Sequence, residues 1–335
     1  MAAQALPTRG EPWFDDGNVI LATSADENPT AFRVHRGVIA RHSEVFEAMF
    51  LVPQPVSDVV ETMDGCQVVR MWDSPVELSN LIVALYDGAK FSNENLSDFF
   101  FLAGILRLST KYFIAKLRLQ AIQFLTQTWS YTLKGHDDMV EAALRTPVNA
   151  DGLSYPRVHP LHVVNLAREV NVRLIVPTAV YFLSLYPLED LLRADHPKLM
   201  VEHPSRPSSE LSTSDLRDYT LMFQKRVATI LTFVRNFCGT RQALPTCMSG
   251  PECTRGFARL SSRLSRSWIP RTGPFHYMSQ AVTDLSEDPK ANVCGPCRRA
   301  FAQDVAALRE KMWDEMPSIL GMPPWEDLIA MDLQG

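Results

Sequence analysis

The feature that most constrains this fold is a change of hydrophobic period within the first fifty residues. Residues 18–24 and 30–34 have the composition of two short strands, and the turn cluster at 25–29 between them predicts a hairpin. Apolar residues then recur at helical spacing from Val38 to Phe50, interrupted by Ser43 as an expected helix N-cap. A strand hairpin followed at once by a helical hairpin predicts an α+β fold.

The next eighty residues continue this alternation of strand and helix. Residues 67–72 are predicted as a third strand, and helices are expected over 75–86, 95–108 and 110–127. The segment Ser74-Pro75-Val76-Glu77 has the order of a capping box, with proline at its preferred first helical position. Gly88 is expected to end that helix in a left-handed conformation.

Beyond residue 130 the pattern is helical throughout. Helices are predicted over 137–146, 159–171, 174–185 and 188–193, followed by a long helix over 213–237 that Ser212 would cap. We therefore expect a flexible tail over 1–17, an α+β domain over 18–130, a helical region over 131–240 and a cysteine-containing segment over 241–335.

A motif of spaced residues runs through the first fifty positions and is densest within 31–50: Asp16, Phe32, His35, Arg36, Ile39, Ala40, Ser43, Phe46, Met49 and Phe50. With these residues, the stretch 16–128 resembles the BTB (POZ) domain family. This resemblance implies a small sheet flanked by helical hairpins, with the histidine of the motif in a structural role. The region from His159 to Leu192 resembles the BACK-like helical extensions that follow BTB domains in basidiomycete fungi.

The BTB resemblance implies a protein–protein interaction adaptor. Its expected partners are proteins: a second copy of the chain in a homodimer, or a cullin scaffold of a ubiquitin ligase. His35 with Arg36 would also suit a catalytic base beside an anion clamp, but no carboxylate or nucleophile is spaced to form a triad with them. The chain also lacks a Gly-rich phosphate loop, a nucleophile elbow and a His-Glu-x-x-His motif, so we do not expect an enzyme.

The most chemically specific feature is the set of cysteines near the C-terminus. Cys247 and Cys253 form one pair, and Cys294 and Cys297 form a second pair about forty residues later. Two thiolate pairs can supply the four tetrahedral ligands of a structural zinc ion. Free buried thiols and a redox-active Cys-x-x-Cys pair are the alternatives that the sequence leaves open. Zinc is the one cofactor that we expect.

Between these pairs, Arg255, Arg259, Arg263 and Arg266 recur at helical spacing. A basic stripe beside a zinc module is one basis for nucleic-acid binding, which makes a nuclear regulator the alternative function. Because the net charge is −5, we favour a solvated helix face and do not expect nucleic acid as a partner. Without a signal peptide or a long apolar run, the chain is expected to be intracellular, in cytoplasm or nucleus, and not membrane-bound.

Overall fold

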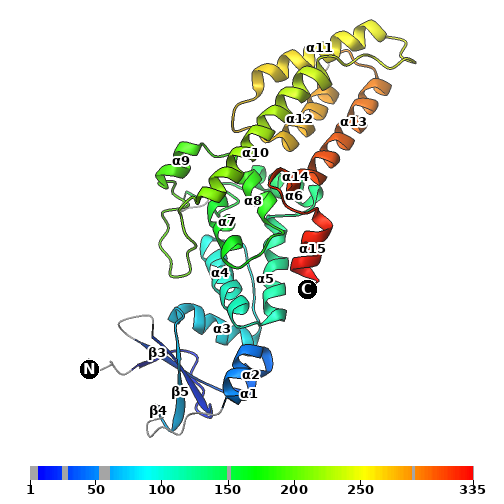
Figure 1. The fold of residues 1–335 in the computed structure, drawn as a ribbon. Helices are drawn as coiled ribbons and strands as arrows, with labels where there is room; N and C mark the ends of the chain where they lie inside the picture. The colour runs from blue at the N-terminus through cyan, green and yellow to red at the C-terminus, as the bar shows by residue number, and fades with distance from the viewer. Residues whose placement is uncertain (1–6, 25–28, 53–60, 149–151, 289–290, 335) are drawn as a thin grey trace. The chain divides into compact units, whose positions relative to one another are not determined.

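The computed structural model describes residues 7–24, 29–52, 61–148, 152–288 and 291–334 (Figure 1). They form one small sheet and many helices, which confirms the predicted α+β class. The chain divides into two compact units. The first runs to Leu125 and includes Asn165–Val172 and Val201–Ser208, and the second contains the remaining residues. No helix among the described residues is long and apolar enough to cross a bilayer.

The sheet of the first unit has five strands in the order β1-β3-β2-β5-β4. Every residue of the central strand β2 is buried, which explains why all of its residues except Thr23 are apolar. β2 pairs antiparallel with β3 and parallel with β5, as expected of a hairpin followed by a helical crossover. The bounds are β1 Thr8–Arg9, β2 Val19–Thr23, β3 Thr30–Val34, β4 Thr62–Met63 and β5 Cys66–Met71.

The described part of the expected N-terminal tail is ordered, so the prediction of a flexible tail is wrong for residues 7–17. β1 pairs with β3 in parallel, and the Phe14 amide donates to the Arg33 carbonyl at 3.0 Å. The Phe14 ring stacks on Tyr86 with centroids 4.3 Å apart. Backbone pairing and this aromatic contact hold the segment on the sheet. Residues 1–6 lie outside the described part of the chain.

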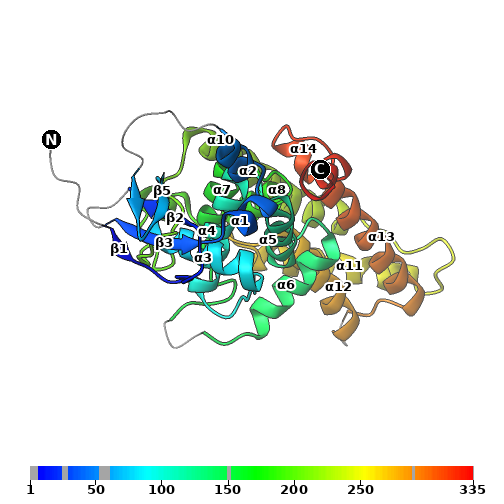
Figure 2. The same ribbon diagram turned by 90° about the horizontal axis from the view of Figure 1, so that it is seen from below.

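Helices α1 and α2 lie between β3 and β4 in the chain, three helices follow β5 among the described residues of the first unit's main segment, and α1 packs against both α2 and α3 (Figure 2). The predicted cap at Ser43 is confirmed, because its hydroxyl accepts the Phe46 amide at 3.1 Å. The same hydroxyl donates to the Tyr112 carbonyl at 2.6 Å and so ties the helical hairpin to α4. The bounds are α1 Arg36–His42, α2 Glu44–Leu51, α3 Pro75–Asp87, α4 Leu96–Lys111 and α5 Ala115–Thr128.

The predicted capping box at the start of α3 is wrong. Ser74 precedes the helix and Pro75 is its first residue, but the Ser74 side chain makes no capping hydrogen bond. Glu77 is instead buried and forms an ion pair with Arg107 at 2.7 Å. Arg107 also donates to the Ser205 carbonyl at 2.9 Å. The carboxylate that the sequence pattern assigned to local capping thus serves a tertiary contact.

The second unit is helical, and α11, α12 and α13 lie side by side in both ribbon views (Figures 1 and 2). Phe257 of α11, Met278 of α12 and Phe301 of α13 belong to one buried cluster. The segment after residue 241 therefore contributes to an apolar core. The bounds are α6 Leu133–Arg145, α7 Pro160–Glu169, α8 Val176–Leu183, α9 Leu188–Arg193, α10 Thr213–Thr232, α11 Gly250–Ser267, α12 Pro274–Glu287, α13 Gly295–Asp314, α14 Met316–Ile319 and α15 Trp325–Leu333.

The predicted long helix over 213–237 is present but changes character near its end. Ser212 caps α10, as predicted, by accepting the Asp215 amide at 3.1 Å. The helix then continues as a π-helical segment, η1, over Phe233–Cys238. π-Helical turns are rare and occur often at functional sites, because they widen the helix and re-aim its side chains.

A buried histidine in α6 makes the second unit sensitive to acid. Neither ring nitrogen of His136 has a hydrogen-bond partner among the described residues, and the ring lies among those of Tyr181, Phe275 and Trp313. Burial, reinforced by the charges of Arg309 and His276, lowers the pKa of His136 to about 3.

Because this pKa lies below that of the unfolded chain, unfolding takes up a proton, and stability falls as pH drops below about 6.5. We expect His136 to account for a loss of about 2 kcal/mol between pH 7.5 and pH 5. The free energy of unfolding should be measured with urea at both pH values. Between pH 7.5 and pH 5 it should fall about 2 kcal/mol less in His136→Met than in the parent chain. Equal losses in the two proteins would show that His136 does not carry the effect.

Candidate metal centre

Four cysteines, from two separate parts of the second unit's sequence, converge on one point. The sulfur atoms of Cys247, Cys253, Cys294 and Cys297 all lie within 4.8 Å of one another. Cys247 Sγ is 3.6 Å from both Cys253 Sγ and Cys294 Sγ. These separations are far longer than a disulfide bond of about 2.05 Å, and all four are free thiols. The structure thus brings together the predicted metal-ligating residues.

Both cysteine pairs are positioned by the first turn of a helix. Cys253 lies in the first turns of α11, which starts at Gly250-Pro251, and Cys247 lies just before that start. Cys294 is the N-cap of α13, which starts at Gly295-Pro296, and Cys297 lies in its first turn. The helical turn at the start of α11 closes the five-residue gap between the first two cysteines. Two helix N-termini therefore face the cluster, and their dipoles favour thiolate over thiol.

A glycine in α11 lets the second pair approach the first. A Cβ atom at Gly256 would lie 2.4 Å from the Ala291 carbonyl oxygen and 2.4 Å from a Val293 methyl carbon. The segment leading to Cys294 therefore crosses α11 more closely than a side chain at position 256 would permit. Arg259 fixes this crossing by donating to the Ala291 carbonyl at 3.0 Å.

Backbone amides around the cluster donate to the sulfur atoms. The Cys294 amide donates to Cys253 Sγ at 3.2 Å, and the Leu244 amide donates to Cys297 Sγ at 3.4 Å. A hydrogen bond from the Cys297 amide lowers the pKa of Cys294 to about 7, whereas burial raises the pKa of Cys253 to about 12. Sequence patterns gave no indication of these amide donors, because backbone groups leave no trace in residue type.

The four side chains fit a tetrahedral zinc ion. Sulfur ligands about 2.3 Å from zinc define a tetrahedron with edges of about 3.8 Å, close to the 3.6 Å that separates Cys247 Sγ from Cys253 Sγ and from Cys294 Sγ. Thiolate is the ligand that structural zinc sites use most, and amide donors to sulfur are the expected outer shell. The donor set also has no open position for a substrate. The cluster can hold a closed, structural ion that ties α11 to α13.

The histidine of the N-terminal motif lies in a separate polar network, within the first unit. His35 Nδ1 is 2.9 Å from the Tyr86 hydroxyl, and His35 Nε2 is 3.1 Å from Asp16 Oδ1. The hydrogen bond from His35 holds the pKa of the Asp16 carboxyl below its usual value. The sequence predicted that no carboxylate is spaced to form a triad with His35, and it did not anticipate that Asp16, which precedes β2, lies beside the His35 ring. Tyr86 does not supply a nucleophile, since burial raises its pKa.

The other residues of the N-terminal motif contribute packing contacts or hydrogen bonds within the first unit. Arg36 contacts Asn18 through its backbone amide at 2.8 Å and the Phe50 carbonyl through its guanidinium. Ala40, Met49 and Phe50 are half-buried on the helical hairpin. The motif's fully buried apolar side chains are Phe32, Ile39 and Phe46.

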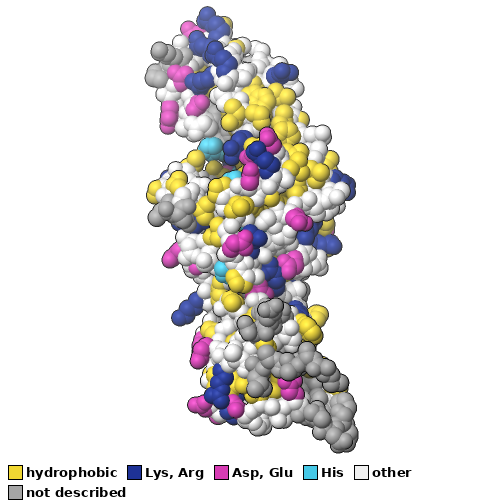
Figure 3. All heavy atoms as spheres, turned by 90° about the vertical axis from the view of Figure 1, so that its left-hand side faces the viewer, with side chains coloured by type: hydrophobic (Ala, Val, Ile, Leu, Met, Phe, Trp, Pro, Cys, Tyr) yellow, Lys and Arg dark blue, Asp and Glu magenta, His cyan; other side chains and the backbone are white. Residues whose placement is uncertain are grey.

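Two arginines of the α11 stripe, Arg259 and Arg263, have partners outside their own helix. Arg263 forms ion pairs with Asp288 at 2.9 Å and Asp284 at 3.7 Å, while Arg259 is engaged with the Ala291 carbonyl. Figure 3 shows acidic side chains interspersed among the basic ones at the top end of the view. This distribution favours the solvated helix face over a nucleic-acid surface.

The chain matches no family model, no curated protein and no solved structure.

Proposed function

We propose that this chain is a protein-binding adaptor and not an enzyme. In this proposal residues 18–130 form a BTB-type module, residues 131–240 form a BACK-like helical extension, and residues 241–335 complete the helical part. Support comes from the order of elements in the first unit: a strand hairpin, a helical hairpin, a third strand parallel to the first of the hairpin, and three helices. The polar residues of the motif support it too, because His35 and Ser43 form hydrogen bonds within the first unit that hold its elements together.

The observation that carries the adaptor proposal is an exposed apolar face on α3. Val76 and Val83 are seven residues apart on the helix, so they share one face, and they are 41% and 42% exposed. Trp72, just before the helix, is 75% exposed. Exposed tryptophan beside aliphatic side chains is typical of protein interfaces, where aromatic residues contribute most of the binding energy. We propose that this α3 face binds a protein partner, either a second copy of the chain or a cullin.

We also propose that the four cysteines hold a structural zinc ion. It would supply no chemistry to a substrate. Its part is to fix the start of α13 against the start of α11, across the 41 residues that separate Cys253 from Cys294. A thiolate site of this kind requires a reducing compartment, so we propose an intracellular location.

Association of the purified full-length chain tests the adaptor proposal. We expect sedimentation velocity to show self-association at micromolar concentration, or co-migration with a purified cullin. The double variant Trp72→Ala with Val83→Lys should weaken that association by at least about tenfold, because it removes an aromatic anchor and adds a charge.

Leu144→Lys is the matched control, because Leu144 is 68% exposed but lies on α6 of the second unit. It should leave the association unchanged. A chain that stays monomeric and ignores the cullin, or a double variant that binds as well as the parent, would count against the α3 face.

A further inference from the structure

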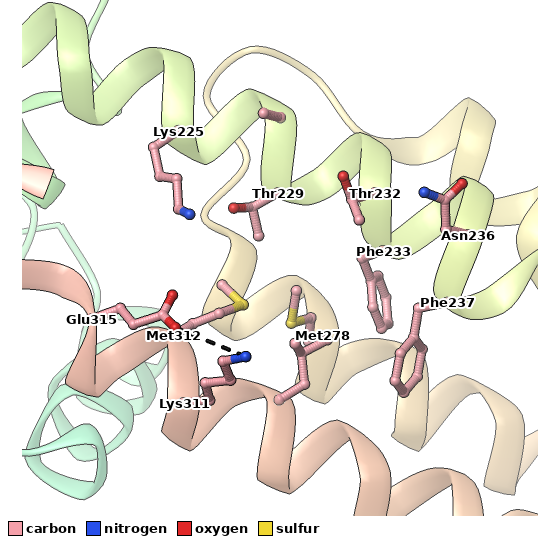
Figure 4. Close-up of a pocket in the computed structure, with 12 residues that line it drawn as sticks. Lys225, Thr229, Thr232, Phe233, Asn236, Phe237, Met278, Lys311, Met312 and Glu315 are labelled. Atoms are coloured by element: carbon pink, nitrogen blue, oxygen red, sulfur yellow. Dashed lines mark ion pairs between the residues drawn. The ribbon is translucent and has the colours of Figure 1, made fainter.

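A groove in the second unit has the composition of a ligand site. It lies between α10–η1 and α13, with Met278 of α12 at its floor, and has a volume of about 500 Å³ (Figure 4). Phe233 and Phe237 from η1 and Met312 from α13 supply much of its apolar surface. Volumes of about 300–1,000 Å³ with mainly apolar walls are typical of small-molecule sites. The π-helical segment η1, a feature often associated with function, forms one wall.

The groove has a cationic end. A separate small cavity of about 20 Å³ shares Lys225, Thr229 and Met312 with the groove as lining residues, and Arg226 also lines this cavity. Lys225 is exposed and pairs with no carboxylate among the described residues. Figure 4 shows its side chain directed into the gap between the helices.

Arg226 is a buried charge with only neutral partners. Its side chain is 2% exposed and donates to the Ser184 hydroxyl at 3.1 Å and to the Ser184 and Thr272 carbonyls at 2.6 Å. No carboxylate in the described part of the chain pairs with it. These bonds use three of the five guanidinium N–H donors. A buried cation without a counter-charge is unfavourable, and an anion bound nearby would offset that cost.

The acidic group in the groove is already engaged. Glu315 pairs with Lys311 at 3.9 Å, as Figure 4 shows by a dashed line. Lys225 is therefore left for a ligand, and the buried charge of its neighbour Arg226 adds to the positive potential at that end of the groove. We propose that this groove binds a small amphipathic carboxylate, with its carboxylate at Lys225 and its apolar chain along Phe233, Phe237 and Met278. The side chains of Met278 and Met312 can adapt to such a chain, because methionine is flexible and polarisable.

Titration of the full-length chain with decanoate tests this proposal. Calorimetry should detect one binding site per chain, and decanol or decyltrimethylammonium, with the same chain length, should bind at least about tenfold more weakly. Lys225→Met should weaken decanoate binding about tenfold and leave decanol binding unchanged. Lys134→Met is the charge-matched control, because Lys134 is exposed on α6, outside the groove, and should bind decanoate as the parent does.

A second variant tests whether decanoate binds in the groove or on another apolar surface. Ala228 is exposed and lines the groove, so Ala228→Trp should block decanoate without disturbing the core. The proposal fails if decanoate does not bind, if all three probes bind alike, or if Lys225→Met binds decanoate normally. It fails equally if Ala228→Trp instead dissociates a dimer of the chain, because a second copy would then be the occupant.

Discussion

Cys297→Ser is expected to abolish zinc binding and to lower the stability of the second unit by at least about 5 kcal/mol, or about 10 °C in melting temperature. Removing one of four thiolates leaves an incomplete tetrahedron, and the link between α11 and α13 is lost. Hydrogen exchange should show faster exchange in these two helices. Calorimetry of the same sample gives the change in melting temperature.

Cys66→Ser is the matched control, because Cys66 is buried in the first unit, far in sequence from the cluster. It should keep its zinc and its exchange pattern in α11 and α13. Should Cys297→Ser prove too unstable to purify, a strong chelator applied to the parent chain replaces it, and added zinc should restore the melting temperature. A melting temperature indifferent to chelator would exclude a stabilising metal.

Phe46→Ala is expected to destabilise the first unit by about 3–5 kcal/mol. The Phe46 ring is 1% exposed and stacks on Tyr112 with centroids 4.6 Å apart. Its loss would leave a cavity between the helical hairpin and α4, which Ser43 also joins by its hydrogen bond to Tyr112. Denaturant unfolding of variant and parent gives the difference in free energy.

Leu51→Ala provides the comparison, because Leu51 lies on the same helix but is 74% exposed. It should change the free energy of unfolding by less than about 0.5 kcal/mol. If both substitutions lower the free energy of unfolding equally, the Phe46 ring does not anchor the core of the first unit.

The main strands and helices were predictable where apolar residues recur at the spacing of a strand or a helix. β2, β3 and the helices around Phe46 and Ile230 follow directly from such periods. The two-residue strands β1 and β4 were missed, because two residues carry no alternation to detect. Glu77 was misassigned for another reason: its partner Arg107 is thirty residues away, and local patterns cannot reveal a tertiary ion pair.

The candidate site was partly predictable. Residue type and spacing identified the four cysteines, but not that two helix N-termini bring them together, since Gly256 permits that approach only in three dimensions. The contact between Asp16 and His35 was missed because the two residues are far apart in sequence, and local patterns do not reveal such a contact. The cationic end of the groove gave no signal at all, because Lys225 and Arg226 resemble ordinary surface charges until burial is known.

Metal content is the most direct test of the central claim that the four clustered thiols form a zinc centre. Native mass spectrometry of the full-length chain, purified under reducing conditions without added metal, should find one zinc ion per chain. The Cys294→Ser, Cys297→Ser double variant should contain none. A metal-free parent chain that also fails to take up added zinc would contradict the account.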